Sequence, residues 1–325
     1  MTTNIPSLFS EDPSNNSKTI MVIGSIGYDQ KIYLDEIPEI GSTKIGNIEI
    51  SLGGKGNIEA VACARAGEET IFLGAVGSND YANLLKHFED NNVNAILKSV
   101  KNIPSHTACI LIDKDGNHRI ISDPRASYFV DKNLINLNKE SLDKSSYILL
   151  QLEISFETVE YIIEQYKNSK KTIILRPSPP NQVERLKKQF KNVNYLILNE
   201  SELGIISGDE TKTSEQIEAA CEKLMKFKPK NIIVPLLDKG WLLWNEKEGK
   251  KKFPPYSAGE AIDKVGSMDC FIGVFASFLC KNYEVDEAMK YAILASSICC
   301  TKEGTIPSLP SLPEIMSKKN KIKNW

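Results

Sequence analysis

The stretch "AIDKVGSMDCFIGVFASFL", residues 261–279, places two aspartates around a Gly-Ser-Met turn and follows them with an apolar run at helical spacing. Asp269 therefore stands where a helix begins, and two interpretations are open. An aspartate in the first turn of a helix stabilises that helix as a cap or through its charge. Alternatively, the backbone N–H groups of the turn hold an anion while Asp269 removes a proton nearby. The rest of the sequence is needed to choose between them.

Composition and charge restrict the function classes. The chain has 325 residues, of which 41% are hydrophobic and 25% charged, values typical of a soluble globular protein with one or two domains. With 40 basic and 42 acidic residues, the net charge of −2 gives no electrostatic reason to expect nucleic acid as a partner. No apolar run is long enough to cross a membrane, and residues 1–18 lack the features of a secretory signal. We therefore expect a cytoplasmic protein.

Cysteine and histidine give no indication of a zinc site. The seven cysteines form no CxxC pair and lie mostly in apolar surroundings, which favours buried, reduced thiols. The three histidines show no metal-ligand spacing.

Short apolar segments predict a parallel sheet. A β-branched run at 19–25 closes on Gly24, and helical patterns alternate with further strands after residue 145. These strands are expected at 147–152, 172–176, 195–199 and 231–237, with helices near 155–168, 181–190 and 213–227. Such alternation predicts a parallel sheet covered on both faces, with ligands beyond the carboxyl ends of the strands. The residues at those ends are Glu153, Arg176, Asn199 and Glu202.

Two segments differ from this pattern. Residues from about 30–52 and 106–123 alternate apolar with polar side chains, and the second reads as a hairpin. They predict a small antiparallel sheet with one wet face, which would act as a lid over the site. We expect one domain at 19–315, between a polar N-terminal tail at 1–18 and a basic, solvated tail at 316–325.

A glycine-rich turn lies directly before the helix expected at 56–67. In "SLGGKGNIEAVACARAG", residues 51–67, Gly53, Gly54 and Gly56 surround Lys55. Glycines let a backbone turn tightly and approach a ligand closely, although this turn alone is a weak signal. It is not a Walker A loop, because GxxxxGK[ST] is absent.

Taken together, these stretches resemble the ribokinase-like (PfkB) family of carbohydrate kinases over residues 19–315. "GGKGN" at 53–57 is similar to the family's GGKGxN, and "DKVGSMDCFIGVF" at 263–275 to its DTxGAGDxFxGxF. "LLQLEIS", "LNESE" and "TKEGTIPSLP" are similar to further family segments. The resemblance implies a three-layer α/β/α fold with a central, mostly parallel sheet and a small antiparallel β lid.

The resemblance also implies a reaction and the residues that perform it. The reaction is phosphoryl transfer from ATP to a sugar hydroxyl, with Asp269 as the base that accepts the hydroxyl proton. The N–H groups of Gly266, Ser267 and Met268 would hold the phosphoryl oxygens. The residues implied at the sugar are Asp29, Gly53, Gly54, Lys55, Asn57 and Glu153. Those implied at the nucleotide and its Mg²⁺ are Asn199, Glu202, Pro235, Asp238 and Gly240. A monovalent cation, K⁺, would lie among oxygens at Asp263, Val265, Cys299, Lys302, Gly304 and Ser308.

The sequence departs from the family pattern on both sides of the site. Gly27 replaces an amide that grips the sugar, and Ile58 replaces an asparagine and is expected to point an apolar group at the pocket. On the nucleotide side, Pro235 lacks an N–H, Leu237 adds bulk, and Met268 is expected to crowd the phosphoryl path. Arg176 replaces the asparagine of an NPAP segment and adds a positive charge.

Three functions remain open on the sequence alone. The first is an ATP-dependent sugar kinase, with ribose as the nearest acceptor and a modified sugar or a nucleoside second. The second is an inactive relative that serves as a structural or regulatory subunit of a larger assembly, and the third is a sensor that binds sugar or nucleotide without transfer. A kinase is expected to pair through its lid into a homodimer, whereas an inactive relative would offer the lid edge to another protein.

Overall fold

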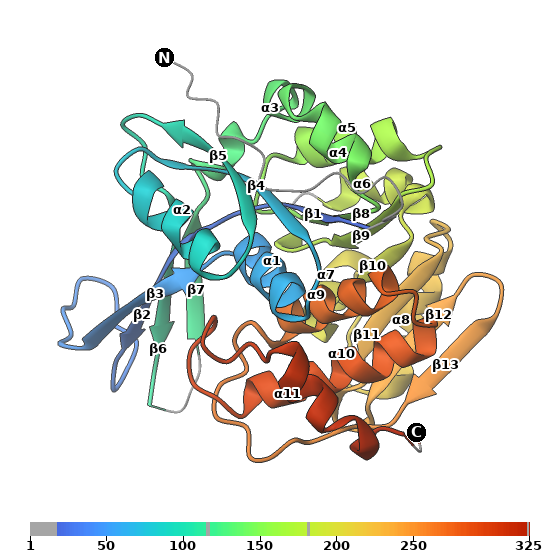
Figure 1. Ribbon diagram of the computed structural model, residues 1–325. Coiled ribbons are helices and arrows are strands. Elements are labelled where there is room, and N and C mark those ends of the chain that lie inside the picture. Colours follow the sequence, from blue (N-terminus) through green and yellow to red (C-terminus); the bar gives the residue numbers. More distant parts are fainter. Residues whose placement is uncertain (1–17, 115–117, 181–182, 324) are drawn as a thin grey trace.

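A computed structural model describes residues 18–114, 118–180, 183–323 and 325, and its centre is a nine-stranded sheet (Figure 1). The strand order is β13-β12-β11-β10-β9-β8-β1-β4-β5, parallel from β11 to β5 and antiparallel where β12 and β13 are added. The strands are β1 (Ile20–Ile23), β4 (Thr70–Gly77), β5 (Asn94–Val100), β8 (Tyr147–Gln151), β9 (Thr172–Arg176), β10 (Tyr195–Ile197), β11 (Asn231–Pro235), β12 (Trp241–Asn245) and β13 (Gly249–Phe253). The mostly parallel sheet is confirmed.

Helices cover both faces of this sheet, because its strands are apolar on both sides. In β1, Ile20 and Val22 pack into one core and Met21 and Ile23 into the other, as the two-residue period of a strand requires. The first face is covered by α1 (Lys55–Arg65), α2 (Tyr81–Asp90), α9 (Ser267–Cys280), α10 (Val285–Cys300) and α11 (Leu312–Ser317). The second is covered by α3 (Lys132–Leu137), α4 (Lys139–Lys144), α5 (Phe156–Tyr166), α6 (Val183–Leu186), α7 (Glu200–Ser207) and α8 (Ser214–Met225). The short 3₁₀ turns are η1 (Ser127–Phe129), η3 (Lys187–Asn192), η4 (Leu237–Lys239) and η5 (Lys319–Lys321).

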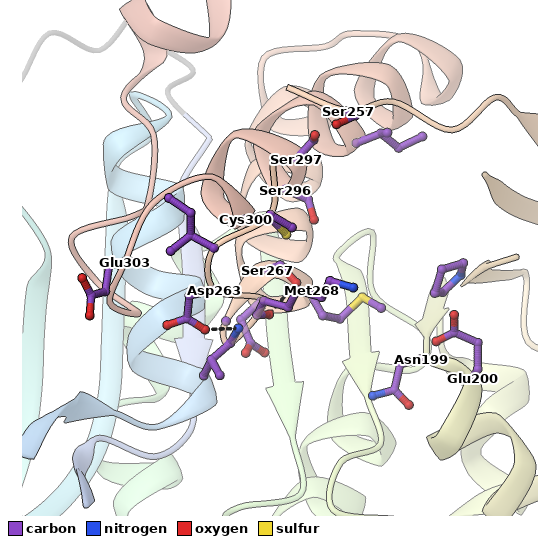
Figure 2. A pocket seen from close by; sticks show the side chains of 18 of the residues that line it. Asn199, Glu200, Ser257, Asp263, Ser267, Met268, Ser296, Ser297, Cys300 and Glu303 are labelled. Carbon is purple, nitrogen blue, oxygen red and sulfur yellow. Dashed lines mark hydrogen bonds between the residues drawn. The ribbon is translucent and has the colours of Figure 1, made fainter. Parts of the chain in front are cut away.

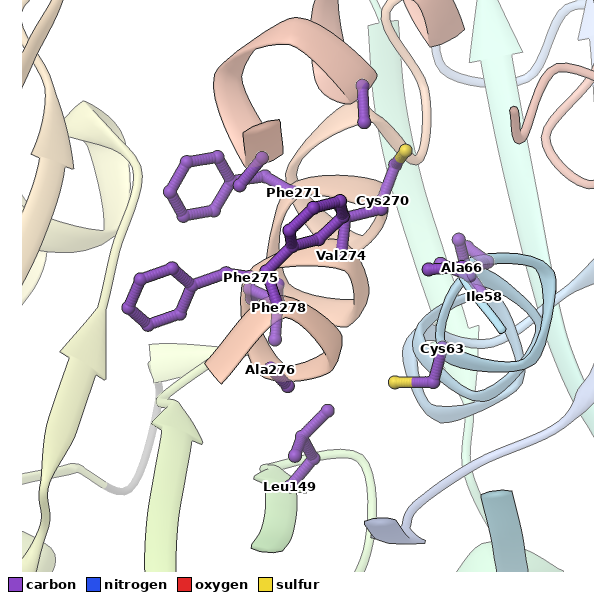
Figure 3. Packing of buried hydrophobic residues seen from close by; sticks show 14 of the residues in the cluster. Ile58, Cys63, Ala66, Leu149, Cys270, Phe271, Val274, Phe275, Ala276 and Phe278 are labelled. Atoms are coloured by element: carbon purple, nitrogen blue, oxygen red, sulfur yellow. The ribbon is translucent and has the colours of Figure 1, made fainter. Parts of the chain in front are cut away.

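Helix α9 is buried along most of its length and lies against α1 (Figure 3). Phe271, Phe275 and Phe278 are completely buried and fill the core on the sheet side. On the side of α1, a Cβ at Gly273 would lie 2.7 Å from the backbone oxygen of Glu59. Only glycine permits this approach, so the helices that begin at the two glycine turns are held firmly together.

The lid is a separate four-stranded sheet in the order β3-β2-β6-β7, with β2 (Gly27–Tyr33), β3 (Asn47–Gly53), β6 (His106–Ile112) and β7 (His118–Asp123). The pairs β2–β3 and β6–β7 are antiparallel, as expected, but the central pair β2–β6 is parallel. The reason is that β2 and β6 start from remote parts of the chain and leave the larger sheet in the same direction. The turn of the predicted hairpin, 115–117, lies outside the described residues, as does the N-terminal tail apart from Lys18.

The basic C-terminal segment does not form the solvated tail that we expected. Ile322 is 2% exposed and packs into the core, and the Trp325 ring lies 5.4 Å from the Tyr256 ring. Lysines surround Ile322 and Trp325 in the sequence, so the segment reads as polar although its two apolar residues pack against the domain. In the described part of the chain, no helix is both long and apolar enough to cross a membrane.

Candidate active site

The turn at 266–269 has the geometry of an anion site. Gly266 adopts a left-handed conformation with φ of 78°, and α9 begins at the next residue. A side chain there is excluded by space as well, because a Cβ would lie 2.7 Å from Cγ2 of Thr305. The first N–H groups of a helix have no partner within the helix, so those after Gly266 point outward with a partial positive charge.

The Asp269 carboxylate does not cap this helix. Its hydrogen-bond partner is Arg176, whose Nη1 donates to Asp269 Oδ1. Asp269 is 4% exposed, and burial raises its pKa, although the charges of Arg176 and Lys55 lower it in part. The capping interpretation therefore does not explain the side chain, which is buried in an ion pair.

A cluster of charged residues lies on the sugar side predicted from the sequence. Glu153 Oε1 accepts from Lys55 Nζ at 2.5 Å, and its Oε2 accepts from the Lys55 backbone N–H at 2.9 Å and from the Ser25 hydroxyl. Burial alone would raise the pKa of Glu153, but Lys55 and His106 lower it to about 2. Glu153 therefore stays ionised and fixes Lys55 at the start of α1.

Asp29 belongs to the same cluster but has no such compensation. Burial and the nearby Glu153 carboxylate raise the pKa of Asp29 to about 6, against the opposing charge of Lys55. Asp29 and Lys31 share the buried face of β2, which is the face of the lid that turns towards the larger sheet. The structure thus brings Asp29, Lys55, Glu153 and Asp269 within electrostatic reach of one another.

Glycines allow this cluster to form. A Cβ at Gly53 would collide with the Asp29 carboxylate, and Gly54 has φ of 93° and packs against the Ser25 carbonyl. At Gly27, a Cβ would collide with the backbone oxygen of His106. The amide missing at Gly27 therefore could not be accommodated, because the neighbouring lid strand occupies its space.

Two residues of α1, Asn57 and Ile58, do not lie where the sequence motif predicts them. Asn57 is completely buried, donates to the Gly53 carbonyl at 3.2 Å and meets His87 Nε2 at 2.8 Å, so its amide is taken up within the protein. Ile58 was expected to face the pocket; instead it is 4% exposed and packs in the core beside α9 (Figure 3). Position 58 of α1 therefore faces α9 and the core, not the pocket.

A cavity of about 1140 Å³ adjoins Asp269. Figure 2 shows part of its lining, including Ser267 and Met268. Asp269, Arg176 and the Gly266–Met268 turn line one part of it, and the lid contributes Lys31 and Tyr33. Asn199, Glu200, Pro235 and Leu237 lie along another wall, so Met268 and Leu237 face the cavity as expected. Asp29 and Glu153 are not among the lining residues. The cavity therefore corresponds to the predicted nucleotide side.

Several lining residues were missed in the sequence. Ile293, Ser296, Ser297 and Cys300 form a stripe along α10, and Trp241 stacks on Phe271 with ring centroids 4.2 Å apart. The spacing i, i+3, i+4, i+7 marks one face of a helix. Small polar side chains at three of these positions in an otherwise buried helix were the available signal.

The remaining residues predicted at the nucleotide are Asn199, Glu202, Asp238 and Gly240. Asn199 caps α7 by accepting from the Glu202 N–H at 2.7 Å, and Glu202 Oε2 accepts from the Asn199 N–H at 2.9 Å. Glu202 is 5% exposed and faces Arg176 instead of the cavity. Asp238 is exposed and does not line the cavity. Gly240, with φ of 101°, is needed where a side chain would meet the Phe253 carbonyl.

The loop predicted to hold K⁺ contains carboxylate and hydroxyl oxygen atoms of the kind that bind a cation. Asp263 Oδ1 accepts from the Val265 N–H at 2.9 Å, and its Oδ2 pairs with Lys31 Nζ of the lid at 3.1 Å. Lys302 points away to Glu314 at 2.8 Å. Within the described residues, the buried Thr305 hydroxyl has no partner. These are hard oxygen ligands, which fit a monovalent cation, whereas no cluster of acidic, cysteine or histidine side chains in the described ranges suits a transition metal.

The remaining loop predictions also have defined places. Cys299 Sγ and Ser308 Oγ lie 3.0 Å apart, and the Ser308 hydroxyl donates to the Thr305 carbonyl at 3.0 Å. Gly304 supplies a left-handed turn with φ of 82°. The predicted cation residues are thus gathered around the loop that follows α10.

Comparisons with known proteins cover almost the whole chain. A family model described as pfkB family carbohydrate kinase matches residues 17–312. A deoxyribokinase of Salmonella typhi is 31% identical over 298 residues, covering 91% of this chain and 96% of that protein. A ribokinase of Dictyostelium discoideum is 31% identical over 313 residues, covering 91% and 98%. The match includes both glycine turns and the lid.

Solved structures give the same picture. A ribokinase from Giardia lamblia superposes with a TM-score of 0.87 at 27% identity, covering 94% of this chain and 100% of that one. A ribokinase from Cryptococcus neoformans in complex with ADP superposes with a TM-score of 0.79 at 25% identity, covering 93% and 100%.

Proposed function

This chain belongs to the PfkB family of carbohydrate kinases, and we propose that it transfers the γ-phosphoryl group of ATP to a hydroxyl group of a pentose, most directly ribose. The observation that carries the proposal is the buried Asp269, placed directly after a left-handed glycine turn where the large cavity meets the charged cluster. Relatives named ribokinase and deoxyribokinase support a five-carbon acceptor. Because no side chain fits at Gly27, a deoxypentose is the second acceptor to test.

The residues act on the acceptor first. Asp29 of the lid, together with Lys55 of α1 and Glu153 after β8, orients the sugar hydroxyls, and Asp269 accepts the proton of the reacting hydroxyl. The oxygen of that hydroxyl forms a bond to the γ-phosphorus as the bond from phosphorus to the β-phosphate oxygen breaks. The N–H groups after Gly266 stabilise the negative charge on the transferred group. The lid excludes water from this reaction.

The nucleotide is held mainly by the shape of its cavity. Trp241, Tyr256 and the α10 stripe form walls wide enough for an adenine nucleotide, and ADP in a related ribokinase supports ATP as the donor. Mg²⁺ prefers oxygen ligands, and Glu200, which lines the cavity, would supply them, because the Asn199 oxygen already caps α7. When bound, Mg²⁺ neutralises charge on the triphosphate. K⁺ at the Asp263 loop is the further cation that we propose, tested by comparing potassium with tetramethylammonium salts.

The lid also supports a homodimer. Ile48, Ile50 and Ile121 share the outer face of the lid sheet and are 62%, 66% and 67% exposed. A face this apolar on a four-stranded sheet favours burial against a second copy. Light scattering is expected to give twice the chain mass of 36.3 kDa, and Ile50→Lys is expected to give the monomer. Leu137→Lys, which changes an exposed leucine on α3, is the matched control.

An ADP-release assay across ribose, deoxyribose, hexoses and nucleosides tests the proposed reaction. We expect the highest kcat/KM with a pentose and no turnover by Asp269→Asn. A chain that binds ATP and sugar by calorimetry but turns over neither would be a sensor. A chain that binds neither would be the structural subunit considered above.

A further inference from the structure

Arg176, the last residue of β9, links two parts of the site. Its Nη1 donates to Asp269, and its Nε and Nη2 donate to Glu202 Oε1 at 3.3 and 3.0 Å. The three side chains are between 6% and 8% exposed. One cation is therefore buried between the predicted base and a carboxylate on the predicted nucleotide side.

The guanidinium is not used up by these bonds. An arginine has two N–H groups on each terminal nitrogen, so one N–H on Nη1 and one on Nη2 remain. In the described ranges these two have no protein acceptor, and Arg176 lines the large cavity beside the Gly266–Met268 turn. Two N–H donors on one planar guanidinium are the kind of group that binds the oxygens of a phosphoryl group.

The position relative to the reaction follows from Asp269. The base must lie within hydrogen-bond distance of the attacking hydroxyl, and that hydroxyl must approach the γ-phosphorus. A cation bonded to Asp269 and facing the cavity therefore lies next to the group that is transferred. Negative charge is spread over the oxygens of that group in the transition state, where a fixed cation is most effective.

Building on the proposed kinase function, we propose that Arg176 is a catalytic residue: its two remaining N–H groups bind the transferred phosphoryl group, while its ion pair holds Asp269 in position as the base. Arg176 is positively charged at a point where the resemblance described above implies a neutral asparagine. Glu202 then serves to orient Arg176, and it does so because its second oxygen is fixed by the cap of α7.

The electrostatics agree with this geometry. Burial raises the pKa of Asp269, and the largest opposing influence is Arg176. Removing the guanidinium would raise the pKa of Asp269 further, so the base would be protonated at a higher pH. The acid limb of the kcat profile would then move to higher pH, which reports the loss of the ion pair with Asp269.

The test compares Arg176→Gln with wild type and with Arg185→Gln, which removes an arginine that is 64% exposed on α6. We measure kcat and both KM values from pH 5 to 9, and the binding of ADP with aluminium fluoride and sugar. Arg176→Gln is expected to lower kcat by about 10²- to 10³-fold and to move the acid limb of the kcat profile to higher pH. The variant should also lose the tighter ADP binding that aluminium fluoride, a mimic of the transferred phosphoryl group, gives in wild type. The KM for ATP should stay within about threefold.

Each outcome has a defined meaning. If wild type and Arg176→Gln have the same kcat and acid limb while Asp269→Asn is inactive, the role of Arg176 is refuted and the proposed function stands. If wild type phosphorylates no sugar, both fail. If Arg176→Gln does not fold, Arg176→Lys decides, because lysine keeps the charge but loses the planar fork. We then expect kcat to fall about tenfold with the acid limb unchanged, and a wild-type kcat would refute the proposal.

Discussion

The two sides of the cleft are built on different principles. The predicted sugar side is a cluster of charged residues, where Lys55 and Glu153 pair while Asp29 is buried beside them. The predicted nucleotide side is a cavity of about 1140 Å³, lined by apolar, charged and small hydroxyl side chains, the last of these on α10. In the proposed reaction, the compact charged cluster would orient the small acceptor, and the open cavity would hold the larger nucleotide. Substitutions on the two sides should therefore affect different quantities.

The largest effect is expected where the two sides meet. Asp269→Asn removes the base but keeps the volume of the side chain and the turn after Gly266. We expect kcat to fall by about 10³-fold or more, with ATP affinity nearly unchanged. Steady-state kinetics and calorimetry with ATP test this. Turnover within tenfold of wild type would assign the base to another residue.

On the sugar side, Glu153→Gln should affect both acceptor binding and stability. It leaves Lys55, whose side chain is 25% exposed, without its charged partner, which costs about 2 kcal/mol in the free energy of unfolding. The KM for sugar should rise sharply while the KM for ATP does not. Denaturant unfolding and kinetics check this, with Glu157→Gln as control, since that side chain is 57% exposed.

Asp29→Asn should separate function from stability. The pKa of Asp29 in the folded protein, about 6, lies above its ordinary value of 3.8. Ionised Asp29 therefore lowers the stability of the fold, and this loss is complete above about pH 6. Near pH 7 the asparagine variant should be more stable by about 2–3 kcal/mol, yet bind sugar poorly. This advantage should disappear as the pH falls through 6 towards 4, because wild-type Asp29 then becomes neutral. Equal stability of the two proteins at pH 7 would contradict the prediction.

The smallest effect is expected on the nucleotide side. Ser296→Leu adds bulk to the α10 stripe, and we expect the KM for ATP to rise about tenfold with little change in the KM for sugar. The neighbouring Ser297 is unsuitable for this test, because its hydroxyl accepts from the Ala258 N–H at 2.7 Å. A change in sugar KM as large as that for ATP would show that the two sides are not independent.

The sequence predicted what depends on local pattern. Apolar runs located β8 and β9 within a residue, and the glycine turns indicated where α1 and α9 begin. Contacts between remote segments were not accessible. Nothing near Gly27 reveals that His106 occupies the space beside it, and nothing near Arg176 names Asp269 and Glu202 as partners. Ile58 was placed in the pocket because a motif was followed where helix packing decides the direction.

The close contact of α1 with α9 at Gly273 sets a fixed span across the cleft. The turn before α1 adjoins the predicted sugar cluster, and the turn before α9 is the predicted phosphoryl site. Where the two helices meet, a Cβ on Gly273 would lie only 2.7 Å from the backbone oxygen of Glu59. These two turns cannot move apart without separating a packed pair of helices. The distance between the hydroxyl groups that the cluster would bind and the hydroxyl that would react is therefore fixed by the packed backbones of α1 and α9. Converting the chain to a longer acceptor would require rebuilding the lid strands, since side-chain changes leave that distance as it is.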